Sequence, residues 1–129
     1  MSTSDVLLSL PLYFLIFGRI FAAATHTLAP KWAMGLIGVD AAGTPALAYG
    51  RMFGIRNAVL AVGLLNLDSF SSPATFVALN VLIDAVDAYS FYTGGRQKDI
   101  SAKAGNQGAA ISLAAVVFGV LALLITPSV

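Results

Sequence analysis

Residues 109–126 read AAISLAAVVFGVLALLIT and contain no charged side chain, and Pro127 follows them directly. A helix that crosses the hydrocarbon core of a bilayer needs about 17–25 predominantly apolar residues. In lipid, a helix satisfies its backbone hydrogen bonds within its own segment, so an apolar run of this length is typical of a transmembrane helix. The stretch therefore predicts a membrane-spanning helix near the carboxyl end of the chain.

The rest of the chain has the same character. Of its 129 residues, 58% are hydrophobic and only 10% are charged, whereas a soluble domain carries about 25% charged residues. Three further segments, at residues 6–25, 45–67 and 73–93, are long and apolar enough to span a bilayer. Pro45 and Pro73 stand at the beginnings of two of them, where proline is tolerated. We expect a single domain over residues 1–129, an all-α integral membrane four-helix bundle embedded in the lipid bilayer.

The positive charges between the expected spans are distributed unevenly. Four Lys and Arg residues fall in the first and third connections, and none falls in the second connection or in the two tails. Cytoplasmic loops carry an excess of Lys and Arg, so both termini are expected on the non-cytoplasmic side. The four residues are Lys31, Arg96, Lys98 and Lys103.

The first connection is longer than the others and partly apolar. Its Lys31–Trp32 pair is typical of an anchor at the membrane interface, because Trp prefers the headgroup level. Residues 33–39 after it are expected to form a short interfacial helix or an ordinary loop.

Composition also excludes several classes of function. The chain has no Cys and a single His, so disulfides, thiolate metal sites and histidine-based metal sites are not expected. A net charge of +1 argues against a nucleic-acid partner, which needs a basic face. No nucleotide motif is present, and we expect neither a metal nor a cofactor.

Five charged residues lie inside the expected spans, where each costs several kcal/mol unless it is paired or faces a wet cavity. With a rise of about 1.5 Å per residue, Arg56 and Asp84 lie roughly 15 and 13 Å from the cytoplasmic ends of their helices. Arg51, Asp87 and Arg19 lie roughly 9 Å in. This spacing predicts an Arg56–Asp84 pair and, less directly, an Arg51–Asp87 pair.

Helical phase places some of these groups together. Asn80, Asp84 and Asp87 follow an i, i+4, i+7 pattern and share one face of the third span. On the second span, Gly50, Gly54 and Asn57 form a face of small residues, with an Arg on either side. Gly50 and Gly54 form a GxxxG pair that favours close helix packing, either inside the bundle or in a homodimer.

The arrangement suggests acid–base chemistry on a lipophilic small molecule. Two close carboxylates ionise at different pH values, so one can act as a base while the other acts as an acid. We assign Asp84 as the base, Asp87 as the acid and Arg56 as the group that orients them, for an isomerisation, a cyclisation or an epoxide opening. Three Arg against two Asp leave one excess positive charge, which favours an anionic or polar substrate group. The expected substrate-binding residues are Arg19, Arg51, Asn80, Tyr89 and His26.

Three motifs in these spans carry a family resemblance. Residues 18–21 (GRIF), 50–56 (GRMFGIR) and 84–87 (DAVD) make the chain resemble a family of small uncharacterised four-span membrane proteins of bacteria and fungi. The resemblance implies the fold and a location in the bacterial plasma membrane or the fungal endoplasmic reticulum, but no activity. A looser similarity to DoxX-like four-helix membrane proteins transfers no role.

Two other functions fit the same residues. Intramembrane Arg and Asp are also found in transporters and channel subunits, although the non-cytoplasmic half of the expected bundle carries no ionisable residue. The Arg–Asp pairs can instead serve only to fix helix packing in a structural or assembly protein.

Overall fold

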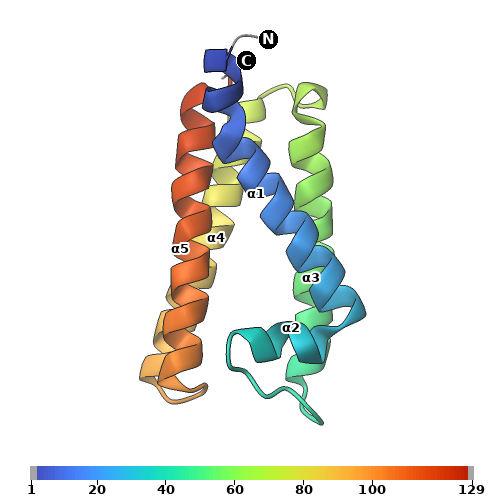
Figure 1. Ribbon diagram of the computed structural model, residues 1–129, viewed down its shortest axis with the longest axis vertical. Coiled ribbons are helices and arrows are strands. Elements are labelled where there is room, and N and C mark those ends of the chain that lie inside the picture. The colour runs from blue at the N-terminus through green and yellow to red at the C-terminus, as the bar shows by residue number, and fades with distance from the viewer. Residues whose placement is uncertain (1–2, 128–129) are drawn as a thin grey trace.

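The computed structural model describes residues 3–127, with side chains from Ser9 onwards, and this range contains helices and no strand. The all-helical prediction is therefore confirmed for this part of the chain. Figure 1 shows the order of the elements. They are α1 (Thr3–Leu28), α2 (Pro30–Leu36), α3 (Ala46–Leu65), the 3-10 turn η1 (Leu67–Ser69), α4 (Pro73–Arg96) and α5 (Ala102–Ile125).

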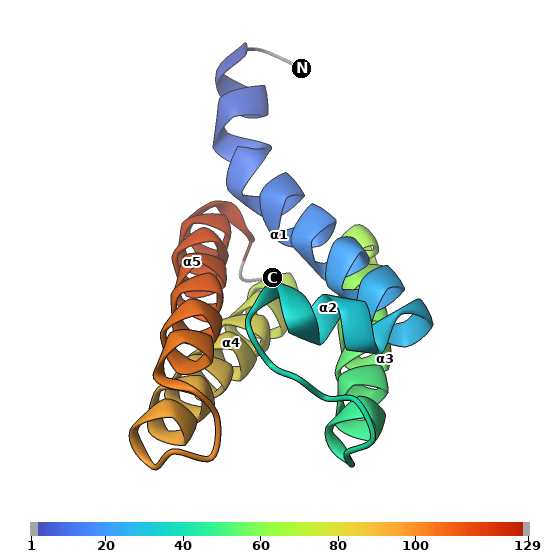
Figure 2. The ribbon, with the colours of Figure 1, turned by 60° about the horizontal axis from the view of Figure 1, so that its bottom comes forward.

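The four long helices form two closely packed pairs. Helix α1 packs chiefly on α3, and α4 packs chiefly on α5, while α1 also touches α5. Helices α3 and α4 make little contact with each other. Figure 1 shows α1 crossing the bundle obliquely, and Figure 2 shows the short helix α2 beside the ends of α1 and α3. The two pairs are therefore joined more by α1 on α5 than by α3 on α4.

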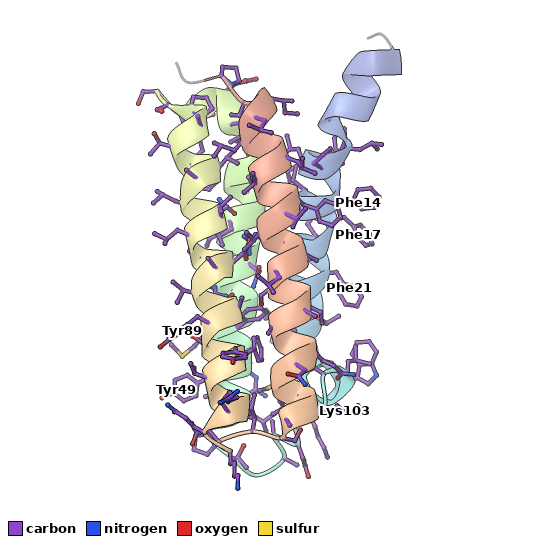
Figure 3. The ribbon with its side chains drawn as sticks, turned by 90° about the vertical axis from the view of Figure 1, so that its left-hand side faces the viewer. Phe14, Phe17, Phe21, Tyr49, Tyr89 and Lys103 are labelled. Carbon is purple, nitrogen blue, oxygen red and sulfur yellow. The ribbon has the colours of Figure 1, made fainter. Side chains whose placement is uncertain are left out.

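Three helical segments of the described chain are long and apolar enough to cross a membrane: Ser9–Leu28, Pro73–Arg96 and Ala102–Ile125. Helix α3 is not one of these three segments. It has 20 residues, but Arg51, Arg56 and Asn57 lower its mean hydropathy. The outward faces of the helices are apolar as well. Figure 3 shows Phe14, Phe17 and Phe21 projecting from one side of α1, where each is about half exposed or more.

Helices α4 and α5 are both longer than the predicted spans. Helix α4 begins at Pro73 as expected and continues to Arg96, and α5 already begins at Ala102. The side chain of Ser101 accepts a 3.1 Å hydrogen bond from the backbone N–H of Ala104 and so caps α5. The polar stretch before residue 109 is therefore helical, and only residues 97–101 connect the two helices.

Close approach of α4 and α5 explains the glycines in this stretch. A Cβ atom on Gly105 would lie 2.8 Å from the Cα atom of Gly95, which is closer than atoms can pack. Glycine at these two positions lets the helix backbones nearly touch. The glycines that resemble a loop in the sequence belong to a helix crossing.

Gly50 and Gly54 are buried inside the protomer. A Cβ atom on Gly50 would lie 2.8 Å from Met34 Sδ of α2, and one on Gly54 would lie 2.8 Å from the backbone nitrogen of Thr27 of α1. Of the two roles considered for this small-residue face, packing inside the bundle is the one that the structure shows. Helices α1 and α2 cover this face, and the homodimer stays a prediction.

Candidate functional site: a network of arginine and aspartate

The deeper part of the network joins three helices through Arg19. Its Nη2 atom donates a 2.7 Å hydrogen bond to Asp84 Oδ2 of α4, and its Nη1 atom donates a 2.9 Å hydrogen bond to Asn57 Oδ1 of α3. The Arg19 and Asp84 side chains are each only 5% exposed. The Asn57 amide is oriented by its own 2.9 Å hydrogen bond to the carbonyl of Phe53. One guanidinium therefore connects α1, α3 and α4 in the protein interior.

The second ion pair lies between α3 and α4 and is more exposed. Arg56 donates from Nη1 to Asp87 Oδ1 at 3.1 Å and from Nη2 to Asp87 Oδ2 at 2.5 Å. Such a two-point contact fixes the carboxylate geometrically as well as electrostatically. The side chains of Arg56 and Asp87 are 37% and 18% exposed. The Arg56 guanidinium also lies over the Phe53 ring, 4.7 Å from its centroid, which adds a cation–π contact.

The predicted pairing of charges was wrong. Arg56 binds Asp87, not Asp84, and the partner of Asp84 is Arg19. The error came from the predicted helix ends, because α1 continues to Leu28 and α4 to Arg96. Counted from the observed ends, Arg56 lies ten residues inside α3 and Asp87 nine residues inside α4, so these two are at the same level.

Arg51 takes part in neither pair. It is exposed, and it has no ion-pair or hydrogen-bond partner among the described residues. The predicted Arg51–Asp87 pair was therefore wrong as well. Three arginines and two aspartates lie in this region, and Arg51 is the one whose charge is not balanced by a carboxylate.

Asn80 extends the buried polar cluster by one helical turn from Asp84. It is completely buried, and its Nδ2 atom donates a 3.0 Å hydrogen bond to the carbonyl of Phe76. Its Oδ1 atom has no partner among the described residues, and neither does Nε of Arg19. Buried polar atoms are normally paired. In this part of the network, Asn80 Oδ1 can still accept a hydrogen bond and Arg19 Nε can still donate one.

Two predicted binding residues lie away from the carboxylates. Tyr89 is 68% exposed and points outward from α4 in Figure 3. The His26 ring packs edge-on against Phe53 at 4.8 Å, and its Nδ1 atom lies 3.0 Å from the carbonyl oxygen of Ala22. His26 thus contributes to packing between α1 and α3.

Sequence reasoning missed Asn57 and Phe53 as members of the network. Asn57 was interpreted only as part of a small-residue face, although a polar amide inside an apolar helix is itself a signal of an interior partner. Phe53 contacts both His26 and Arg56. Its position one turn from Asn57 was the only sequence sign of this role.

Two open depressions border the network on the side of α3. One, of about 480 Å³, is lined by Arg51, Met52, Ile55 and Arg56. The other, of about 650 Å³, lies between α2 and the start of α3 and includes Lys31, Trp32 and Arg51. Neither depression is lined by Asp84 or Asp87. Arg56 is the residue of the two ion pairs that lines one of these two depressions.

Comparison of the chain with protein-family models, curated proteins and solved structures finds no match. The family resemblance seen in the sequence therefore stays a prediction. Among the described residues, no three His, Cys, Asp or Glu side chains come together as metal ligands.

Proposed function

We propose that this protein is a four-span membrane protein that binds a lipophilic small molecule at the Arg56–Asp87 pair and moves a proton on it. The observation that carries the proposal is the difference between the two ion pairs. Arg19 and Asp84 are 5% exposed, whereas Arg56 is 37% and Asp87 18% exposed. A substrate can reach only the second pair without disrupting the bundle.

The surroundings of Arg56 suit a molecule that arrives from the bilayer. Arg56 lines a depression together with Met52 and Ile55, which offer apolar contact. All four residues that line this depression belong to α3.

Within this site, Asp87 is the proposed proton-transfer group. Arg56 holds both of its carboxylate oxygens and so fixes the direction from which Asp87 meets the substrate. In an isomerisation, Asp87 removes a proton from one atom of the substrate, exchanges it with water at its partly exposed carboxyl group, and delivers a proton to another atom of the same molecule. Asp84, held by Arg19, serves as a fixed negative charge one turn deeper and not as the first base.

A deuterium experiment tests this function even though the substrate is unidentified. The purified protein in nanodiscs is incubated in D₂O with a lipophilic extract of the source cells, and mass spectrometry follows compounds that gain deuterium. We expect such a compound with the wild type and its loss with Asp87→Asn. Asp68→Asn, which alters an exposed acid in η1, is the control. Labelling that persists in correctly folded Asp87→Asn protein would refute the proposal.

A structural role is the second candidate, because both aspartates are bound by arginine and the pairs bridge helices that otherwise touch little. The exchange Arg56→Asp with Asp87→Arg separates the two functions. If the pair only holds the bundle together, the exchange restores thermal stability and every phenotype of the single variants. If Asp87 moves a proton, the exchange restores stability but not deuterium incorporation.

A further inference from the structure

We infer that the depression between α2 and the start of α3 binds the headgroup of an anionic phospholipid. Lys31 and Arg51 hold the headgroup, independently of proton transfer at Asp87. The depression has a volume of about 650 Å³. Its lining includes two cations, Lys31 and Arg51, and the apolar side chains of Leu28, Trp32, Leu36 and Leu47.

Charge complementarity identifies the occupant. Two of the lining residues, Lys31 and Arg51, are cations, and none is an acid. Neither cation has a hydrogen-bond or ion-pair partner among the described residues. The acid nearest in sequence, Asp40, accepts a 3.2 Å hydrogen bond from the backbone of Ala42 and does not line the depression. A phosphate between Lys31 and Arg51 would supply the missing negative charge.

The remaining wall is apolar, as an acyl chain requires. Leu28 is 84% exposed and Leu36 is 55% exposed, and both line the depression with Leu47. Trp32 is 55% exposed, and Trp side chains favour the headgroup level of a bilayer. A cationic pair beside an apolar wall and an interfacial Trp matches a whole phospholipid better than a free phosphate ion.

The position of the depression supports the same occupant. Helix α2 lies at the end of the bundle that also carries the α4–α5 connection and Lys103. This is the end where the positive charges of the connections gather, and by the positive-inside rule it faces the leaflet that is rich in anionic lipids. Basic pockets between helices on this side of a membrane are typical binding sites for anionic headgroups.

Native mass spectrometry with defined lipids tests the inference. The detergent-solubilised protein is titrated with phosphatidylglycerol and, separately, with phosphatidylcholine carrying the same acyl chains. We expect the wild type to retain phosphatidylglycerol more tightly. One basic residue near a membrane surface contributes enough attraction for about a fivefold change in affinity. Lys31→Gln and Arg51→Gln should each weaken phosphatidylglycerol binding by about that factor.

Matched variants make the outcome decisive. Lys103→Gln removes the same charge from the same end of the bundle but outside the depression, and it should leave binding unchanged. Arg51→Lys keeps the charge and should retain most of the affinity, which shows that a loss in Arg51→Gln is not misfolding. Equal retention of both lipids by the wild type, or a loss in Lys103→Gln as large as in Lys31→Gln, would overturn the inference. Deuterium labelling should persist in Lys31→Gln, because this variant leaves Arg56 and Asp87 in place.

Discussion

Arg19 on α1 binds Asp84 on α4 at 2.7 Å, across 65 residues of sequence. The same guanidinium also binds Asn57 on α3, so a single side chain connects the α1–α3 pair of helices with the α4–α5 pair. Helices α3 and α4 pack little on each other, and a second ion pair, Arg56 with Asp87, joins them. The ion pairs thus add to an apolar core in which buried residues of all four long helices meet: Leu15 and Ile16 of α1, Leu64 of α3, Val77 of α4 and Ala122 of α5.

The first prediction concerns the stability of this connection. Asp84→Asn leaves the Arg19 guanidinium buried without a negative partner, and breaking a buried pair in this way costs about 3–5 kcal/mol of unfolding free energy. Asp87→Asn should cost less, because that pair is partly exposed. Thermal unfolding in detergent, followed by circular dichroism, measures both losses.

A double variant serves as the control for this prediction. Replacing Arg19 and Asp84 together by Met removes the unpaired charge, and replacement of a whole buried pair by apolar residues is often neutral or stabilising. The double variant should therefore unfold at a higher temperature than Asp84→Asn. If Asp84→Asn and Asp87→Asn lost the same stability, the difference in burial would have no energetic meaning.

The second prediction concerns the contact between α1 and α3. In Gly54→Ala, the new Cβ atom meets the backbone of Thr27 at 2.8 Å and the carbonyl oxygen of Ala23 at 3.2 Å. Neither backbone can move freely, so this overpacking should cost about 1–3 kcal/mol. Gly18→Ala is the matched control, because nothing lies within 4 Å of its new methyl group and alanine favours a helix. Thermal stabilities that change equally in the two variants would contradict the observed packing.

Much of the fold could be predicted from local signals. The apolar runs predicted the long helices, Pro73 marked the beginning of α4, and the face of Gly50, Gly54 and Asn57 is buried as its spacing indicated. Each of these depends on one segment alone. A face of small residues is buried whichever helix packs on it. Its burial can therefore be predicted from the sequence without knowing which helix that is.

The partners of the charges could not be predicted in the same way. A pairing between helices depends on where each helix ends and how it tilts, and an error of three residues shifts a side chain by about 4.5 Å along the axis. The continuation of α4 to Arg96 and the oblique course of α1 decide that Asp84 meets Arg19. The predicted beginning of α5 was wrong for another reason. The crossing of α4 and α5 requires glycine at positions 95 and 105, and a stretch that contains such glycines resembles a loop in its composition.

Tyr89 illustrates an error of phase. It follows Asp84 by five residues, which is roughly 140° around a helix, so it projects from a different side of α4. The structure accordingly leaves it 68% exposed. The count of residues alone was sufficient to exclude it from the face of Asp84.

The third prediction concerns the cap of α5. Ser101 accepts a hydrogen bond from the backbone N–H of Ala104, and its replacement by Ala leaves that N–H without its partner. Loss of an N-cap side chain costs about 1 kcal/mol. Ser90→Ala is the comparison, since Ser90 is exposed and only donates to the carbonyl of Val86 within its own helix. Equal thermal stability of the two variants would argue that α5 begins elsewhere.

The fourth prediction concerns the orientation of the chain in the membrane. The chain has no Cys, so a single introduced Cys can be labelled without removing others. Ser71→Cys lies in the connection between α3 and α4, and Lys98→Cys lies in the connection between α4 and α5; both residues are exposed. Because the positive charges gather at the α4–α5 connection, we expect a membrane-impermeant maleimide added outside intact cells to label Ser71→Cys only. Permeabilised cells, in which both should react, show that each thiol is accessible. Labelling of Lys98→Cys alone from outside would reverse the proposed orientation, and labelling of both would mean that α4 does not cross the bilayer.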